Sequence, residues 1–213
     1  MKKLAQWIEF EIKIPDFNNS PRKVRKFGKL ILERYNLKVI HFRKSIEIEP
    51  YVNEMFNLIE KTYSNLQTFV PIQKYQINYY KEKYLKYAHP EYIKCVSDRT
   101  DKLIAFVIIM PSFTKALKKA NGKLFPFGIF HLFKAKYFNN RASFYLIGVH
   151  PDYQNKGVIA ILFNEIQKLF NKKGITEVET NPELEENTSI HQLWKNYEHE
   201  LHKKRSTFSI KIK

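Results

Sequence analysis

Apolar and polar positions along the chain follow two different periods, which predicts a fold built from both strands and helices. The segment WIEFEIKIP, residues 7–15, alternates strictly, as a half-buried strand does. We expect this strand at the edge of a sheet, where an unpaired edge invites a second molecule to pair with it. Its inward side chains are predicted to be Ile8, Phe10, Ile12 and Ile14.

The remaining segments divide between the same two periods. Strands are expected over residues 37–42, 142–150, 176–180 and 206–212, with a hairpin over 92–112 around the turn SDRTDK. Helical spacing predicts helices over residues 18–36, 50–66, 71–88 and 188–201, two short helices around the segment NGKLFP, and one ending near Lys173. Because strands and helices are mixed along the chain, we predict an α+β fold with a largely antiparallel sheet.

Composition narrows the class of protein. The chain has 213 residues and a formal net charge of +16, and a positive field favours anionic partners. Its lysines are spread along the whole sequence rather than gathered in blocks, as on an ordinary solvated surface, so we do not expect a nucleic-acid binder. Charged residues interrupt the N-terminal apolar stretch, and no run approaches the ~20 apolar residues of a membrane span. These features predict a cytoplasmic protein without a membrane span.

Cysteine and histidine give no sign of a metal site. The single cysteine, Cys95, lies in a predicted strand between apolar residues, where a small core side chain is expected rather than a nucleophile. His191, His199 and His202 have spacings that suit a metal poorly. We therefore predict that the protein binds no metal.

The most informative stretch is YLIGVHPDYQNKGVIAILFNEI, residues 145–166. It reads as a strand, a polar turn with one glycine, and a helix, an order that suits anion binding because helix starts carry free N–H donors and a favourable dipole. This stretch resembles the GNAT superfamily of N-acetyltransferases, whose turn has the form [RQ]-x-x-G-x-[GA]. Gln154 and Gly157 match it, whereas Ile159 stands where the superfamily has Gly or Ala.

The resemblance implies a fold and a cofactor. The fold is a mixed, mostly antiparallel sheet flanked by helices, with a V-shaped splay between the fourth and fifth strands of the superfamily. The cofactor is acetyl-CoA or another acyl-CoA. Its pantetheine and pyrophosphate are expected along two groups of residues: Ile147, Gly148 and Val149, then Gln154, Asn155, Lys156, Gly157, Val158 and Ile159.

The resemblance also suggests catalytic and substrate-binding residues. Glu179 is the expected base that deprotonates the amine, and Tyr197 the expected acid that protonates the departing thiolate. Trp194 stands where many members have that tyrosine. Candidate substrate-binding residues are Glu177, Asn181, Asn187 and Trp194. We expect an acyl-CoA-dependent N-acyltransferase acting on a small-molecule or peptide amine; the alternative is a GNAT-like module that binds CoA or has a structural role without catalysing.

Several segments, among them NGKLFPFGIFHLFKA and ETNPELEEN, resemble the C-terminal half of an uncharacterised bacterial family with two GNAT-like halves. On that comparison residues 1–35 are a remnant or linker from a first half, and residues 36–213 form the GNAT-like domain. The apolar segment FPFGIFHLFKA is then expected to cover the acceptor side, bind a lipid-like acceptor, or pack against the other half. A homodimer through an exposed edge strand is a further expectation.

Overall fold

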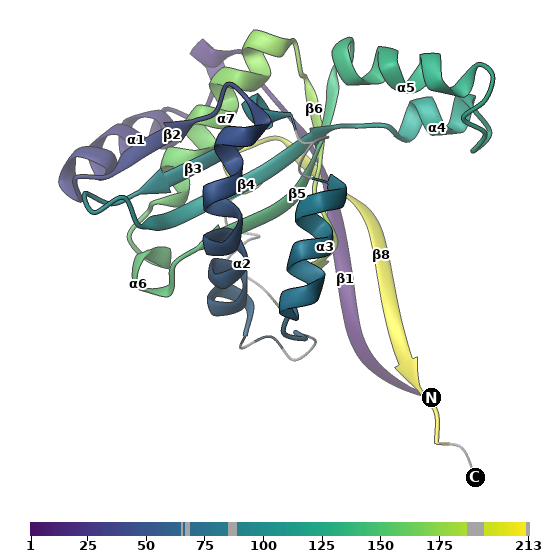
Figure 1. The fold of residues 1–213 in the computed structure, drawn as a ribbon, viewed down its shortest axis with the longest axis horizontal. Helices are drawn as coiled ribbons and strands as arrows, with labels where there is room; N and C mark the ends of the chain where they lie inside the picture. Colours follow the sequence, from purple (N-terminus) through teal and green to yellow (C-terminus); the bar gives the residue numbers. More distant parts are fainter. Residues whose placement is uncertain (65, 67–68, 85–88, 187–193, 212–213) are drawn as a thin grey trace. The chain divides into compact units, whose positions relative to one another are not determined.

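The computed structural model describes residues 1–211 except residues 65, 67–68, 85–88 and 187–193. The chain divides into two compact units (Figure 1). The first unit comprises Met1–Asp16, Pro111–Phe144 and Phe170–Lys213, and the second comprises Phe17–Met110 and Tyr145–Leu169. Strand β5 (Arg141–Val149) begins in the first unit and ends in the second.

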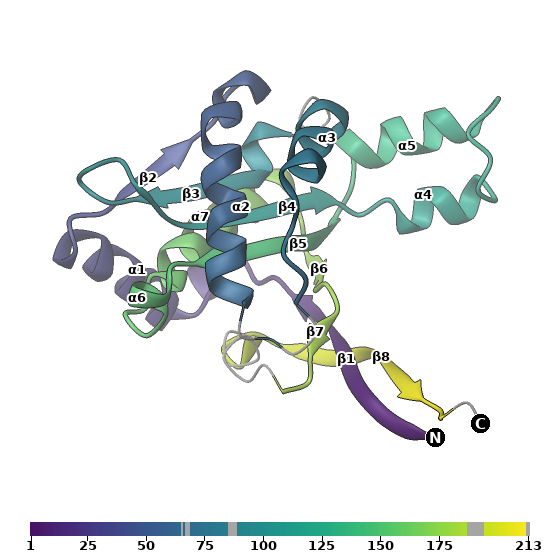
Figure 2. The same ribbon diagram turned by 60° about the horizontal axis from the view of Figure 1, so that its bottom comes forward.

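The sheet of the second unit has the strand order β2-β3-β4-β5. β2 (Lys38–His41), β3 (Ile93–Ser97) and β4 (Leu103–Pro111) pair antiparallel, which confirms the predicted hairpin. Figures 1 and 2 show α2 (Glu49–Tyr63) crossing the face of β3 and β4. Its apolar stripe packs there with Cys95 and Phe106, both fully buried, so the cysteine is the core residue that the sequence predicted.

Three further helices complete the second unit around this sheet. They are α1 (Arg22–Arg34), α3 (Lys74–Tyr84) and α6 (Pro151–Gln154), and α7 (Ile159–Lys173) continues from this unit into the first. The predicted apolar face of α7 is buried along its length. Gly174, with φ of +67°, follows the helix in the left-handed conformation that a glycine cap adopts.

The first unit contains the only parallel pairing recorded among the described strands. β5 pairs parallel with β6 (Glu177–Glu179) from Arg141 to Ser143, after which the pairing stops while β5 continues to Val149. The other pairings recorded here are antiparallel. The predicted mixed, mostly antiparallel sheet flanked by helices is confirmed. The pairing ends where β6 itself ends, and the splay between these strands stays a prediction.

The N-terminal strand is confirmed, but its predicted edge position is wrong. β1 (Lys2–Lys13) pairs with β6 and β7 (Glu183–Leu184) on one side and with β8 (His199–Ser209) on the other. Ile8 and Ile12 are buried, whereas Phe10 and Ile14 are only half-buried. The period of a strand shows which side chains share a face and does not show how many neighbours the strand has.

The predicted boundary at residue 35 does not separate the two units. β1 belongs to the first unit and α1 to the second, so the segment 1–35 contributes elements to both. Whether this segment derives from another half of a longer protein stays a prediction.

The predicted helix over residues 188–201 is wrong at its end. Residues 187–193 lie outside the described residues, and His199 begins β8 rather than continuing a helix. The reason is tertiary pairing: β1 offers a partner along most of β8, and two cations of β8, Lys203 and Arg205, reach the buried Glu9 on β1 at 3.1 and 2.5 Å. The two short helices around NGKLFP are confirmed as α4 (Thr114–Lys119) and α5 (Gly128–Tyr137).

Candidate functional site

The turn between β5 and α7 is closed by polar contacts within the second unit. The His150 N–H donates to the Ile104 carbonyl at 2.8 Å, which fixes the end of β5 to β4. The Gln154 side-chain amide donates to the Val149 carbonyl at 3.2 Å. Gly157 has φ of +74°, a left-handed conformation that side chains other than glycine adopt only at a cost. The sequence therefore specifies this turn through a glutamine and a glycine.

Backbone N–H groups without hydrogen-bond partners lie where the turn meets α7. Among the described residues, the backbone N–H groups of Gly157, Val158 and Ile159 have no hydrogen-bond partner. The next two N–H groups are already satisfied, by the carbonyls of Gly157 and Val158. Unpaired donors at the start of a long helix suit an anion such as a phosphate.

Helix α1 supports this turn from behind. A Cβ added to Gly157 would lie 3.5 Å from the Ile31 side chain, in ordinary contact. A Cβ added to Gly28 would lie 2.9 Å from the Ala160 carbonyl oxygen, so glycine allows α1 to approach the first turn of α7 closely. On the outer side, the Lys156 ammonium lies over the rings of Tyr35 and Tyr153. This places a cation one residue before the free donors.

The last residues of β5 are anchored by α2. The Tyr63 hydroxyl donates to the Ile147 carbonyl at 2.5 Å, and the Thr62 hydroxyl to the Val149 carbonyl at 3.1 Å. A Cβ on Gly148 would lie 2.7 Å from the Phe106 ring, so no larger residue fits without a shift. The strand segment expected to hold pantetheine is thus rigidly placed in the second unit.

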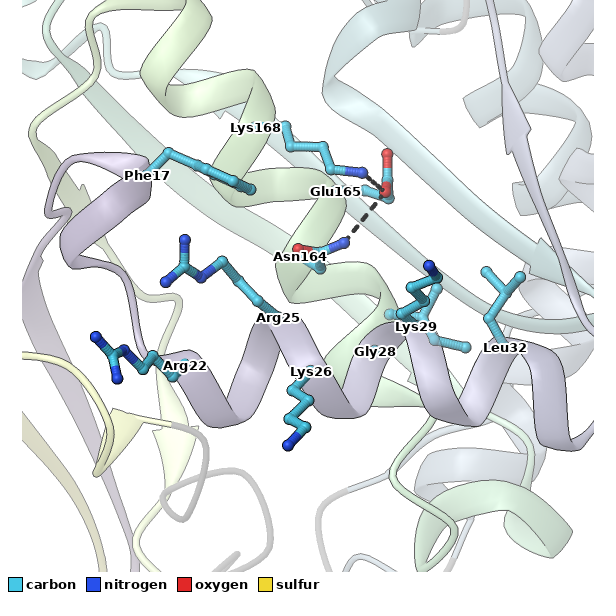
Figure 3. A pocket seen from close by; sticks show the side chains of 11 residues that line it. Phe17, Arg22, Arg25, Lys26, Gly28, Lys29, Leu32, Asn164, Glu165 and Lys168 are labelled. Carbon is cyan, nitrogen blue, oxygen red and sulfur yellow. Dashed lines mark hydrogen bonds and ion pairs between the residues drawn. The ribbon is translucent and has the colours of Figure 1, made fainter.

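A groove of about 640 Å³ lies between α1 and α7 in the second unit (Figure 3). The Lys168 ammonium lies 2.6 Å from the Glu165 carboxylate. Four cations of α1 line the groove, Arg22, Arg25, Lys26 and Lys29, and Figure 3 shows Lys168 directed at Glu165 and Lys26 pointing away from α7. These cations suit an anionic group. The sequence did not predict the groove, because hydrophobic periodicity does not show which helix packs against α7.

The predicted base lies in the first unit and already has side-chain partners. Lys203 forms an ion pair with the Glu179 carboxylate, and the His202 Nε2 atom lies 3.3 Å from it. Glu177, a candidate for substrate binding, pairs with Arg141, which also binds Glu11 at 2.9 Å. The carboxylates of β6 therefore join strands together, and a substrate amine would compete with these cations.

Glu183 is a carboxylate that the sequence analysis did not single out as catalytic. It is 8% exposed, and the Trp194 indole N–H lies 3.2 Å from each of its oxygens. Burial raises the pKa of Glu183 to about 7, an effect that the hydrogen bond from Trp194 partly offsets. A carboxyl group with that pKa can exchange a proton near neutral pH. Trp194 follows Glu183 by eleven residues, a spacing that gave no sequence signal for this pair.

The remaining candidates are mostly buried. Trp194 is 2% exposed and packs against Phe144, with ring centroids 5.3 Å apart. Tyr197 is 8% exposed, and burial raises its pKa to about 12. It precedes β8 and does not lie on the helix that the sequence predicted. Asn181 is half-buried in the loop after β6, and Asn187 lies outside the described residues.

Neither a metal cluster nor a membrane span is found in the part of the chain that the structure describes. There, no three His, Cys, Asp or Glu side chains are grouped so that they could hold a metal ion. Likewise, no described helix combines the length and apolar character needed to cross a bilayer.

Comparison with known proteins identifies the family. The sequence model of the Acetyltransferase (GNAT) family matches residues 52–197, a range that includes β5, the turn with its free donors, and α7. The chain belongs to this GNAT family. No curated protein sequence matches the chain.

Solved structures show the same GNAT fold at low sequence identity. A GCN5-related glucosamine N-acetyltransferase region of a fungal multi-domain β-N-acetylglucosaminidase has a TM-score of 0.56 at 8% identity and covers 96% of this chain and 21% of its own. A GCN5-related N-acetyltransferase from Sphaerobacter thermophilus has a TM-score of 0.54 at 8% identity, covering 95% and 51%. The C-terminal domain of a putative lysylphosphatidylglycerol synthetase from Agrobacterium fabrum has a TM-score of 0.50 at 13% identity, covering 85% and 48%. This GNAT chain thus spans about half or less of each of these proteins.

Proposed function

We propose that this GNAT domain is an acyl-CoA-dependent N-acyltransferase, with acetyl-CoA as the first-choice donor and a small-molecule or peptide amine as the acceptor. The observation that supports the proposal is the group of free N–H donors at Gly157, Val158 and Ile159, at the start of a 15-residue helix. Together with the Lys156 ammonium, these donors suit a pyrophosphate. The left-handed conformation of Gly157, with φ of +74°, is one that glycine adopts without strain, and it gives the turn the shape in which these donors are unpaired.

The roles of the other residues follow from this placement. When bound, acyl-CoA supplies a thioester whose C–S bond is exchanged for a C–N bond to the amine. The backbone of Ile147–Val149, which Tyr63 and Thr62 hold in place, would bind the pantetheine arm. Glu179 would take the proton from the amine, and Tyr197 would return one to the sulfur. Glu183 is a second candidate base because its pKa is about 7.

Thermal unfolding with and without ligand tests the cofactor. At a hundredfold excess over its Kd, a ligand that binds only the folded state adds about 2.7 kcal/mol of stability. We expect acetyl-CoA and CoA to raise the Tm of the wild type, and Gly157→Glu to abolish the rise. Gly174→Glu is the matched control, since Gly174 has a similar positive φ, with no atom within 4 Å of its Cβ position, at the other end of α7. A wild type that shows no shift at millimolar acetyl-CoA or CoA contradicts the proposal.

A second candidate function is a CoA-binding or structural module that does not catalyse. It is favoured by the ion pair that occupies Glu179 and by the burial of Tyr197 and Trp194. Acyl transfer to a panel of amines by the wild type, Glu179→Gln, Glu183→Gln and Tyr197→Phe separates the two functions. If turnover falls in one of these variants, the substituted residue has the catalytic role proposed for it. If the wild type binds CoA but acylates no amine in the panel, the non-catalytic module is supported.

The acceptor and the compartment are also part of the proposal. The similar structures are described by different activities, glucosamine N-acetylation in one and lysylphosphatidylglycerol synthesis in another, so no acceptor is carried over from them. The single, buried cysteine is compatible with a reducing compartment. We therefore propose an intracellular acyltransferase in the cytoplasm.

A further inference from the structure

The α4–α5 hairpin of the first unit has a composition unlike the rest of the chain. Between Lys102 and Pro151 the sequence contains no aspartate or glutamate. Over residues 113–138 it contains six lysines, at positions 115, 118, 119, 123, 134 and 136, together with six phenylalanines. The segment is therefore cationic and aromatic at once, and no acidic side chain within it offsets its charge.

The large apolar side chains of this hairpin face solvent. Nine of them are between 46% and 87% exposed: Leu117, Leu124, Phe125, Phe127, Ile129, Phe130, Phe133, Tyr137 and Phe138. On α5, Ile129, Phe133 and Tyr137 recur every four residues and so share one face, and Phe130 lies beside them. Isolated exposed apolar residues are ordinary, but a continuous patch marks an interaction surface.

The covered side of the hairpin is formed by small residues instead. A Cβ on Gly128 would lie 1.9 Å from the Lys123 carbonyl oxygen and 3.1 Å from the Ala120 side chain, so glycine lets the start of α5 close onto the end of α4. Figures 1 and 2 both show α4 and α5 side by side. The hairpin thus closes through its small residues and presents its aromatic residues outward.

We propose that this hairpin binds the surface of an anionic lipid bilayer. Exposed Phe, Ile and Leu side chains partition into the boundary between headgroups and acyl chains. Lysines within a Debye length of anionic headgroups add electrostatic attraction, and their long stems let the ammonium groups stay in water. An acidic protein would match the charge, but the number of exposed aliphatic and aromatic side chains, nine on this hairpin, favours lipid. The proposal does not depend on the acyltransferase function.

Vesicle co-sedimentation of the full chain tests the proposal. The probes are vesicles of phosphatidylcholine with and without phosphatidylglycerol. We expect binding only when phosphatidylglycerol is present, and a fall of about tenfold or more in the partition coefficient for Phe127→Ser/Phe133→Ser. Lys118→Gln/Lys134→Gln should weaken binding by a similar factor and reduce its dependence on salt.

Matched controls use residues of the same type elsewhere. Phe27→Ser/Phe208→Ser removes two aromatic residues of comparable exposure, and Lys61→Gln/Lys102→Gln removes the same charge; both should bind as the wild type does. Circular dichroism checks that each variant is folded. The proposal is overturned if the wild type does not bind, if the hairpin variants bind unchanged, or if the controls lose as much. It is also overturned if the aromatic variants instead alter self-association by light scattering or binding to single-stranded nucleic acid.

Discussion

At the scale of single residues, burial raises the pKa of Glu183 into the neutral range. The carboxyl group lies in β7 below the Trp194 indole, and its pKa is raised from 4.5 to about 7. In the unfolded chain this group loses its proton near pH 4.5. Between these two values the folded state holds a proton that the unfolded state has lost, so the free energy of unfolding falls as pH rises.

We predict that Glu183→Gln removes this pH dependence. Glutamine retains an oxygen that can accept the Trp194 N–H bond and cannot ionise. Relative to the variant, the wild type should lose up to about 3 kcal/mol of stability between pH 4.5 and pH 8. Urea unfolding across this range measures the difference, with Glu186→Gln, an exposed neighbour, as the control. Parallel pH profiles for the wild type and Glu183→Gln would show that the buried carboxyl does not titrate as described.

At the scale of elements, α1 packs against the turn that we propose to bind phosphate and against the first turn of α7. A Cβ added to Gly28 would lie 2.9 Å from the Ala160 carbonyl oxygen, and one added to Gly157 would lie 3.5 Å from the Ile31 side chain. Displacing α1 should therefore displace the first turn of α7 and its free donors. Helix α1, which lies in the segment predicted to be a remnant or linker, thus packs against the candidate cofactor site.

Gly28→Val tests this support. The added side chain would force the two helices apart, at a cost of about 1–3 kcal/mol, and should weaken CoA binding beyond the loss of stability. Phe27→Val, at an exposed neighbouring position, should leave both quantities nearly unchanged. Calorimetric titration with CoA on folded protein gives the affinity. An unchanged affinity for Gly28→Val would show that α1 does not position the turn.

The sequence predicted most elements of the fold and the strand, turn and helix around Gly157, because these depend on local signals. Gln154, Gly157 and the apolar face of α7 all lie within twenty residues of one another. What the sequence could not predict depends on pairing between distant segments. The β1–β8 ladder replaced a helical pattern after His199, and the Lys203–Glu179 ion pair formed across strands. The approach of α1 to α7 likewise has no local signature.

At the scale of the whole molecule, β1 connects much of the first unit. It is bordered by β6 and β7 on one side and β8 on the other. Among the described strands, β2, β7 and β8 each have one recorded partner, so these strands, rather than β1, are the edges open to the predicted homodimer. Light scattering across a range of protein concentrations measures whether that homodimer exists.

A pair of substitutions in β1 distinguishes a structural strand from a dispensable remnant. Ile12 is 1% exposed, and Ile12→Ala should lower the free energy of unfolding by about 2–5 kcal/mol. Leu4 lies on the same strand but is exposed, and Leu4→Ala should lower the free energy of unfolding by less than about 0.5 kcal/mol. Denaturant midpoints of the two variants give the comparison. Equal, small effects would mean that the fold does not depend on β1.

The most direct test of the central claim is to observe the three free donors during cofactor binding. Titration of ¹⁵N-labelled protein with acetyl-CoA, followed by amide NMR, reports on each N–H group separately. The largest shifts are predicted at Gly157, Val158 and Ile159, with smaller ones at Ile147–Val149 and none in the Gly157→Glu variant. If saturating acetyl-CoA leaves the signals of these three amides unshifted, or shifts only amides elsewhere, the assignment of the cofactor to this turn is contradicted.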